Sequence, residues 1–226
     1  MATLLGTDTI IIGTSLTTWT KTVTVPTNTN LVYVAGGLRN VSISSMSLSG
    51  GGSGASVVSL NAGVSGQPIA YIWRIPNTTT GSQTLTITLG TASSGAFAIY
   101  FVQGDTTTPE VSTNSVDVNA STTPSLTMTT VANSLVIDAI AAYNTISVSG
   151  TANGTQTEIL DNFSNQLISM SSHITASGSS QSVGWTLTAG NNTAYVAAAL
   201  TPFAGGGGPS AAAKARYRRL ANFTNV

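Results

Sequence analysis

Few side chains in this chain of 226 residues can carry out acid, base or metal chemistry. The sequence has one histidine, His173, together with seven aspartates and glutamates, two lysines and no cysteine. Proton transfer, nucleophilic catalysis and zinc binding all draw on these residue types. Because no second histidine and no patterned carboxylate lies near His173 in the sequence, we expect it to be a structural or surface histidine. We predict no catalytic residue, no metal ligand and no cofactor.

Segments rich in glycine and serine can also carry chemistry, as a nucleophile elbow or as a phosphate-binding loop. Serine is abundant here, but Gly51-Gly52-Ser53-Gly54 is a low-complexity glycine run and not a Gly-x-Ser-x-Gly elbow. The glycine clusters at 50–54 and 205–208 lack the Lys-Ser/Thr ending of a phosphate-binding loop. We therefore predict that the protein is not an enzyme.

Three acidic residues, Asp105, Glu110 and Asp117, fall within a span of thirteen residues. Calcium binds roughly six to eight oxygen ligands from carboxylates and carbonyls. The spacing of the three acids matches no EF-hand loop, so we favour acids that make hydrogen bonds in turns. A calcium site at these residues is the alternative.

The tryptophans and tyrosines can either pack in a core or form a platform on which sugar rings stack. Most of them alternate with polar residues inside predicted strands, which favours the core. The residues concerned are Trp19, Trp73, Trp185, Tyr33, Tyr71, Tyr100, Tyr143 and Tyr195.

The end of the chain is basic, because four of the seven cations follow residue 210. A glycine-rich linker at 205–210 precedes a tail at 211–226, in which a helix-forming run follows Ser210 as a predicted N-cap. Such a tail can bind nucleic acid, a membrane surface or a partner protein. Four cations are few for a nucleic-acid arm, so we predict docking to a protein. The docking residues are Lys214, Arg216, Tyr217, Arg218, Arg219, Leu220 and Phe223.

The composition indicates a chain that folds although few of its residues are charged. Only 6% of residues are charged and 41% are hydrophobic, the formal net charge is zero, and serine and threonine occupy 66 positions. Disordered chains combine low hydrophobicity with high net charge, and nucleic-acid binders carry a basic excess. We also expect neither a secretory signal nor a membrane anchor, because no apolar run is long enough.

Short alternating or apolar runs bounded by Gly, Asn, Ser and Pro predict an all-β fold, with helical periodicity confined to the tail. Their density favours an antiparallel, jelly-roll-like β-sandwich. The predicted strands are 20–25, 31–35, 42–48, 56–60, 69–75, 84–89, 97–102, 125–129, 135–141, 155–160, 167–175, 182–187 and 194–200.

The strand pattern repeats once along residues 1–204, in halves of about 15–105 and 115–203. The matching segments are 31–35 with 135–139, 82–89 with 180–187, and 96–99 with 194–197. Two independent small sandwiches or one sandwich with interleaved strands would satisfy this repeat. We favour interleaved strands in a single domain, because the apolar run 135–142 is typical of a strand buried on both faces.

The order of these segments resembles a known group of domains. A Thr-rich strand leads to Asn30-Leu31-Val32 and Ala35, then to a Gly/Ser loop, the strand 82–89, Asp105-Thr106-Thr107-Thr108-Pro109 and a second pass through 185–187 and 197–200. This order resembles Ser/Thr/Gly-rich concanavalin-like or jelly-roll β-sandwich domains of bacteriophage virion proteins and bacterial surface proteins. The resemblance covers residues 15–203 and implies a non-catalytic structural or adhesive module, but it assigns no functional residue.

From the resemblance we predict a bacteriophage virion structural protein, either a capsid decoration or a tail or fibre component. It would be made in the host cytoplasm, attach through its tail to other virion proteins and form a homo-oligomer such as a trimer. One alternative is a carbohydrate-binding or host-adhesion module with a host glycan as ligand. A second is a jelly-roll capsid protein whose basic tail faces the genome. We expect no membrane partner, and the main hypothesis has no nucleic-acid partner.

Overall fold

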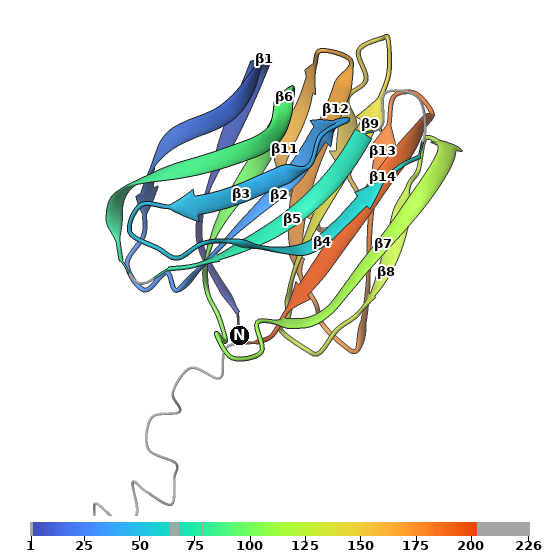
Figure 1. Cartoon of the computed structure of the whole chain (residues 1–226). Coiled ribbons are helices and arrows are strands. Elements are labelled where there is room, and N and C mark those ends of the chain that lie inside the picture. Colours follow the sequence, from blue (N-terminus) through green and yellow to red (C-terminus); the bar gives the residue numbers. More distant parts are fainter. Residues whose placement is uncertain (1, 64–67, 78, 203–226) are drawn as a thin grey trace, which may run out of the picture.

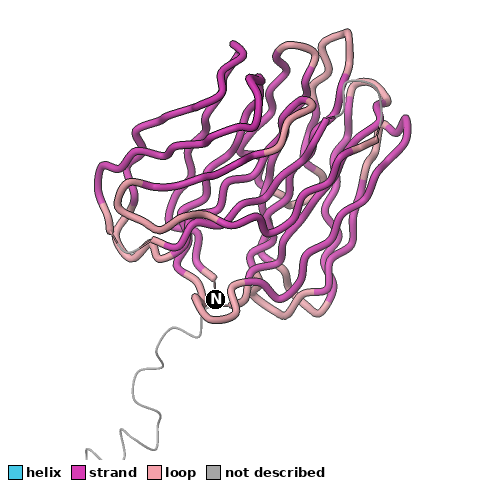
Figure 2. Tube along the Cα trace, viewed as in Figure 1, coloured by secondary structure: helices cyan, strands magenta, loops and turns pink. Residues whose placement is uncertain are grey.

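The computed structural model describes residues 2–63, 68–77 and 79–202. These residues form antiparallel β-sheets, which confirms the predicted all-β class and is consistent with a β-sandwich (Figures 1 and 2). No helix in these ranges is long and apolar enough to cross a bilayer. The predicted tail helix, its docking residues and the glycine-rich linker lie outside the described residues.

The first half of the fold, residues 2–103, is called the N-half here. Its strands are β1 (Thr3–Val25), β2 (Leu31–Arg39), β3 (Ile43–Leu48), β4 (Ala55–Asn61), β5 (Pro68–Pro76) and β6 (Gly81–Gln103). They pair in the order β1-β6-β2-β5-β4, and β3 also pairs with β6. The long strands β1 and β6 therefore contribute both to the layer that contains β2 and to the outer layer that contains β3.

The second half, residues 110–202, is called the C-half. Its strands are β7 (Glu110–Ser121), β8 (Ser125–Thr129), β9 (Leu135–Tyr143), β10 (Gly150–Ala152), β11 (Thr157–Ser164), β12 (Leu167–Thr175), β13 (Ser180–Leu187) and β14 (Asn191–Leu200). One sheet has the order β11-β12-β9-β14-β7 and the other has the order β10-β13-β8. The C-half thus repeats the strand arrangement of the N-half, except that β7 and β8 take the place of the long strand β1, and β13 and β14 take the place of β6.

The two halves also agree in register. Leu31 pairs with Val102 in the N-half, and Leu135 pairs with Leu200 in the C-half. These pairs follow the sequence alignment of the halves, which places 31–35 on 135–139. The same register places Val34 of β2 and Asp138 of β9 at equivalent positions.

The interleaving of strands that we predict from the sequence is wrong. Every described strand pair joins two strands of the same half. Strand β9 is nevertheless buried along nearly its whole length, as predicted. Its second face is covered because the N-half layer that contains β2 and β5 stacks on the five-stranded sheet of the C-half. Stacking thus supplies the burial that interleaving would have supplied.

Three hydrophobic cores result: one inside each half, and one between the stacked sheets. The core between the sheets is rich in alanine, so the sheets approach closely. A Cβ added at Gly37 would lie 2.7 Å from Cβ of Ala141. Beside this contact, Ser169 Oγ accepts from Gly37 N at 2.8 Å and donates to Ala96 O at 2.7 Å. The two halves are thus joined by close packing and by specific hydrogen bonds.

Two edge segments escaped the sequence analysis. The first part of β1 and the whole of β7 lie at sheet edges, and each pairs with one neighbouring strand. Much of β7 is exposed or half-buried, so it lacks the apolar alternation that marks a strand in the sequence. Its acids, Glu110 and Asp117, therefore lie in a strand and not in the turns that the sequence predicts for them.

Both ends of the described chain lie at one end of the molecule. Thr3 pairs with Gln103, and Thr201 N donates to Pro109 O at 2.8 Å. Figure 1 marks the N-terminus at this end. Strands β2 and β5 run from this end to the opposite one, where Arg39 pairs with Pro68. The molecule therefore has an end at which the described chain begins and finishes, and a distal end.

Candidate functional site

A buried carboxylate, Asp138, occupies the core of the C-half. Only 1% of the surface of Asp138 is exposed to solvent. One carboxylate oxygen, Oδ1, accepts from the backbone N and from Oγ of Ser172, both at 2.8 Å. The other, Oδ2, accepts from Tyr195 OH at 2.7 Å, from Gln156 Nε2 at 3.0 Å and from Trp185 Nε1 at 3.3 Å. We call these five residues the Asp138 network.

Burial and hydrogen bonding act in opposite directions on this carboxyl group. Burial raises the pKa of Asp138 to about 6, and hydrogen bonds from Tyr195, Ser172 and Trp185 limit the rise. The pKa of Tyr195 is raised well above its usual value, chiefly by burial, so its hydroxyl stays protonated and donates. At neutral pH the carboxylate is ionised and five donors occupy its oxygens. The carboxylate of Asp138 therefore acts as a structural hydrogen-bond acceptor.

His173 lies close in sequence to this network but belongs to the other face of the sheet. Adjacent side chains of a strand point to opposite faces, and Ser172 faces Asp138. The His173 ring instead meets the edge of Tyr100, with ring centroids 6.0 Å apart. Burial lowers the pKa of His173. The structure therefore brings the histidine against an aromatic ring in the core between the halves and away from the carboxylate of Asp138.

The Asp138 network is the part of the molecule that the sequence analysis missed. Asp138 is the charged residue in the apolar run 135–141, which the sequence analysis predicts only as a buried strand. A charge inside such a run is costly to bury without partners. That mismatch was the available signal, but the donors come from β12, β13, β14 and a loop, whose convergence the sequence does not reveal.

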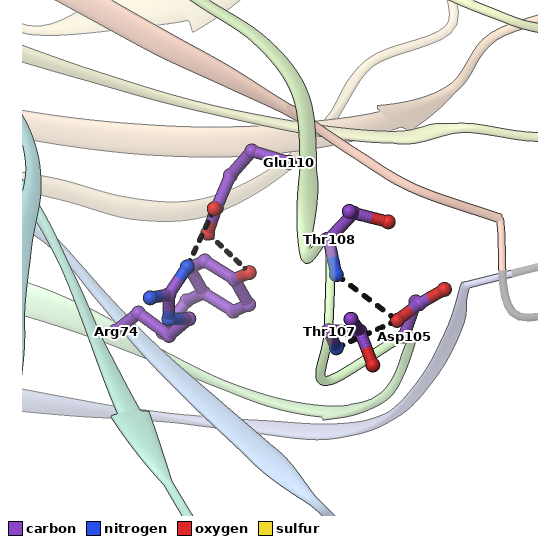
Figure 3. Close-up of polar contacts among 6 residues, drawn as sticks. Arg74, Asp105, Thr107, Thr108 and Glu110 are labelled. Atoms are coloured by element: carbon purple, nitrogen blue, oxygen red, sulfur yellow. Dashed lines mark hydrogen bonds and ion pairs between the residues drawn. The ribbon is translucent and has the colours of Figure 1, made fainter.

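Two of the three acids considered for calcium, Asp105 and Glu110, accept hydrogen bonds from other groups of the protein (Figure 3). Asp105 Oδ1 accepts from the backbone N of Thr107 at 2.7 Å and of Thr108 at 3.1 Å, and these bonds lower its pKa. This confirms the predicted turn hydrogen bonds for Asp105. Asp117 is exposed on β7. In residues 2–63, 68–77 and 79–202, no group of three His, Asp or Glu side chains could hold a metal ion.

Glu110 joins the two halves. Its Oε2 accepts from Arg74 Nη1 at 2.5 Å, and its Oε1 accepts from Tyr33 OH at 2.7 Å. Arg74 and Tyr33 belong to β5 and β2, whereas Glu110 begins β7. Burial is the main cause of a strongly raised Tyr33 pKa, so the phenol remains a donor. This cluster fastens the C-half to the N-half.

All three tryptophans are core residues, as the alternation in the sequence predicts. Trp19 and Trp185 are 0% exposed and Trp73 is 9% exposed. A sugar-stacking platform built on tryptophan is therefore not available on the surface. Tyr143 differs from the other predicted aromatic residues, because it is half-buried at the distal end of β9.

A polar groove lies beside Tyr143, where connections from both halves meet. Its volume is about 600 Å³. The lining residues are Arg39, Asn40, Thr91, Ala92, Ser93, Ser94, Asn165 and Gln166. They come from the end of β2, from the bend of β6 and from the β11–β12 turn, and we call this site the junction groove. It is a concave surface dominated by amides and hydroxyls, with one cation.

Comparison with known proteins identifies no relative of this chain: no protein-family model, curated protein or solved structure matches it. The resemblance to concanavalin-like or jelly-roll domains thus stays a prediction.

Proposed function

We propose that the protein is a non-catalytic structural component of a bacteriophage particle, as a capsid decoration or a part of the tail or fibre. The observation that carries this proposal is the doubled sandwich, in which two sheets stack through an alanine-rich core. Such a body keeps its backbone hydrogen bonds in protected sheets and opens rarely to proteases. These properties suit a protein that must persist outside a cell.

Attachment would use the basic tail. The described chain begins and finishes at the same end of the molecule, opposite the distal end. Its four cations suit an acidic surface on a neighbouring virion protein. Many copies on one particle would make weak individual contacts sufficient.

The experiment compares virus particles that carry the full chain with particles that carry residues 1–204. We expect the full chain to co-purify with particles and the truncated chain to be lost. A matched variant with glutamine at Lys214, Arg216, Arg218 and Arg219 separates charge from length and should also be lost. Full occupancy by the truncated chain would refute tail attachment, and absence of the full chain from particles would refute the virion role. Retention of the tail peptide on nucleic acid, with steep salt dependence, would favour a genome-facing tail instead.

The junction groove favours adhesion as a second function. It lies at the distal end, opposite the end at which the described chain finishes, and its lining is polar. An attached molecule would therefore present this groove outward.

A further inference from the structure

We propose that the junction groove binds a saccharide that carries a carboxylate, with Arg39 as the residue that receives the carboxylate. This inference deepens the adhesive function and rests on it.

Arg39 is held in place before any ligand arrives. Its Nη1 donates to Asn165 O at 3.4 Å and to Gln166 Oε1 at 3.3 Å, and its guanidinium carbon lies 4.7 Å from the centre of the Tyr143 ring. Tyr143 OH donates to the same Gln166 oxygen at 2.9 Å. Both arginine bonds use Nη1, whereas a guanidinium carries five N–H donors. Donors thus remain for a ligand on a group whose orientation is already fixed.

The charge of Arg39 is not balanced by an acid. Lys21 pairs with Asp8, and Arg74 pairs with Glu110. No ion pair of Arg39 occurs within the described ranges, and no carboxylate lines the groove. A planar guanidinium matches the two oxygens of a carboxylate. The groove therefore offers the complement of a single carboxylate group.

Gln166 supports this assignment because its backbone is unfavourable for its residue type. Ser164 pairs with Leu167, and the two residues between them have φ of 51° for Asn165 and 66° for Gln166. Such two-residue hairpin turns favour glycine at the second position. Glutamine there has a conformational cost, and its side chain is the one that bridges Arg39 and Tyr143. Glutamine at this position thus makes the turn less stable than glycine would, and its side chain positions Arg39.

The remaining lining favours a saccharide over an acidic peptide. The hydroxyls of Thr91 and Ser94 and the amide of Asn40 can both donate and accept, as sugar hydroxyls do. Ser93 Oγ already donates to Arg39 O at 3.0 Å, so it adds an acceptor. The Gln166 oxygen already accepts from Arg39 and Tyr143, so its amide adds N–H donors. Ala92 is the apolar residue of the lining, so peptide side chains would find little apolar surface. The groove volume of about 600 Å³ also falls within the usual range of small-ligand sites.

The test is calorimetric titration of the purified full chain with two acidic probes, trigalacturonate and sialyllactose, and with two neutral counterparts, methyl-esterified trigalacturonate and lactose. We expect at least one acidic probe to bind and its neutral counterpart to bind at least about tenfold more weakly, as the loss of a charge-assisted hydrogen bond implies. Arg39→Gln should abolish this preference. Lys21→Gln, which removes a cation at the edge of the N-half, should leave it intact.

Gln166→Gly provides a second variant that does not depend on the arginine. We expect its melting temperature to be unchanged or higher, because glycine suits the turn, while the affinity for the acidic probe falls. Binding of neither acidic probe at millimolar concentration would overturn the proposal, as would equal binding of acid and ester. Binding of polyglutamate in place of saccharides would assign the groove to acidic peptides. Any of these results leaves tail attachment unaffected, because particle occupancy tests that separately.

Discussion

The N-half and the C-half share one strand plan but differ inside. At equivalent positions, β2 has Val34 and β9 has Asp138, and both are almost completely buried. Val34 belongs to an apolar core that contains Trp19 and Phe97, whereas Asp138 is the acceptor of a polar network. The difference teaches that pairing and register determine the fold of each half, and that either interior is compatible with it when its polar groups are satisfied.

The donors around Asp138 have apolar counterparts in the N-half. The register places Tyr195 on Phe97 and Trp185 on Ile87. It likewise places Ser172 on Trp73, whose indole N–H has no hydrogen-bond partner among the described residues. The carboxylate and its donors therefore differ between the halves as a set, so exchanging one member alone should be costly.

The largest expected effect comes from placing the carboxylate in the wrong half. Val34→Asp buries a charge among apolar side chains, which should destabilise the fold by about 5 kcal/mol or prevent folding. Denaturant unfolding followed by tryptophan fluorescence measures this loss. Val34→Ala controls for lost packing and should cost less. Equal losses for the two variants would contradict this prediction, because they would show that water reaches the position of Val34 and solvates the charge.

The reverse exchange should be severe but smaller. Asp138→Val removes the acceptor and leaves the donors of Tyr195, Trp185 and Gln156 buried without it. We expect a loss of about 4 kcal/mol in the free energy of unfolding, within the range for breaking a buried charged network. The same denaturant experiment measures it. A loss below about 1 kcal/mol, the usual worth of one ordinary hydrogen bond, would mean that the network contributes little.

The two halves should also differ in their response to pH. Because the pKa of Asp138 is raised to about 6 in the folded protein, the folded state binds its proton more tightly than the unfolded state does. Its contribution to stability is thus greatest below about pH 4 and is lost as pH rises through 6, by about 3 kcal/mol in total. The measurement is the difference in unfolding free energy between the protein and Asp138→Asn from pH 4 to 7. A difference that is constant across this range would contradict the prediction.

The smallest expected effect comes from replacing Tyr195, one of the donors to Asp138, with phenylalanine, the residue type at the equivalent position 97 of the N-half. Tyr195→Phe removes one of the five hydrogen bonds and should cost about 1–2 kcal/mol at neutral pH. It should also raise the pKa of Asp138 further, because the Tyr195 hydrogen bond lowers it. Thermal unfolding at two pH values measures both effects. A Phe97→Leu variant serves as the matched aromatic change in the N-half, and the stability that it loses relative to the unaltered protein should be the same at both pH values.

Much of the fold follows from the sequence, whereas the sites do not. The segments 31–35 and 135–139 align in the sequence and take equivalent registers, since alternation and apolar runs are local signals. The choice between stacking and interleaving is not local, because both arrangements bury β9 on two faces. The Asp138 network joins residues separated by as many as 57 positions, and the junction groove joins connections from both halves. Only the three-dimensional arrangement brings these groups together.

In this structure one carboxylate, that of Asp138, organises the C-half core as a hydrogen-bond acceptor. The most direct measurement is a titration of the side-chain carboxyl ¹³C resonance of Asp138 by nuclear magnetic resonance, with and without added calcium. The account predicts a midpoint near pH 6 that calcium does not move and that Tyr195→Phe raises. A midpoint near 4, or one that calcium lowers, would contradict it, because the carboxylate would then be accessible to solvent or to a cation.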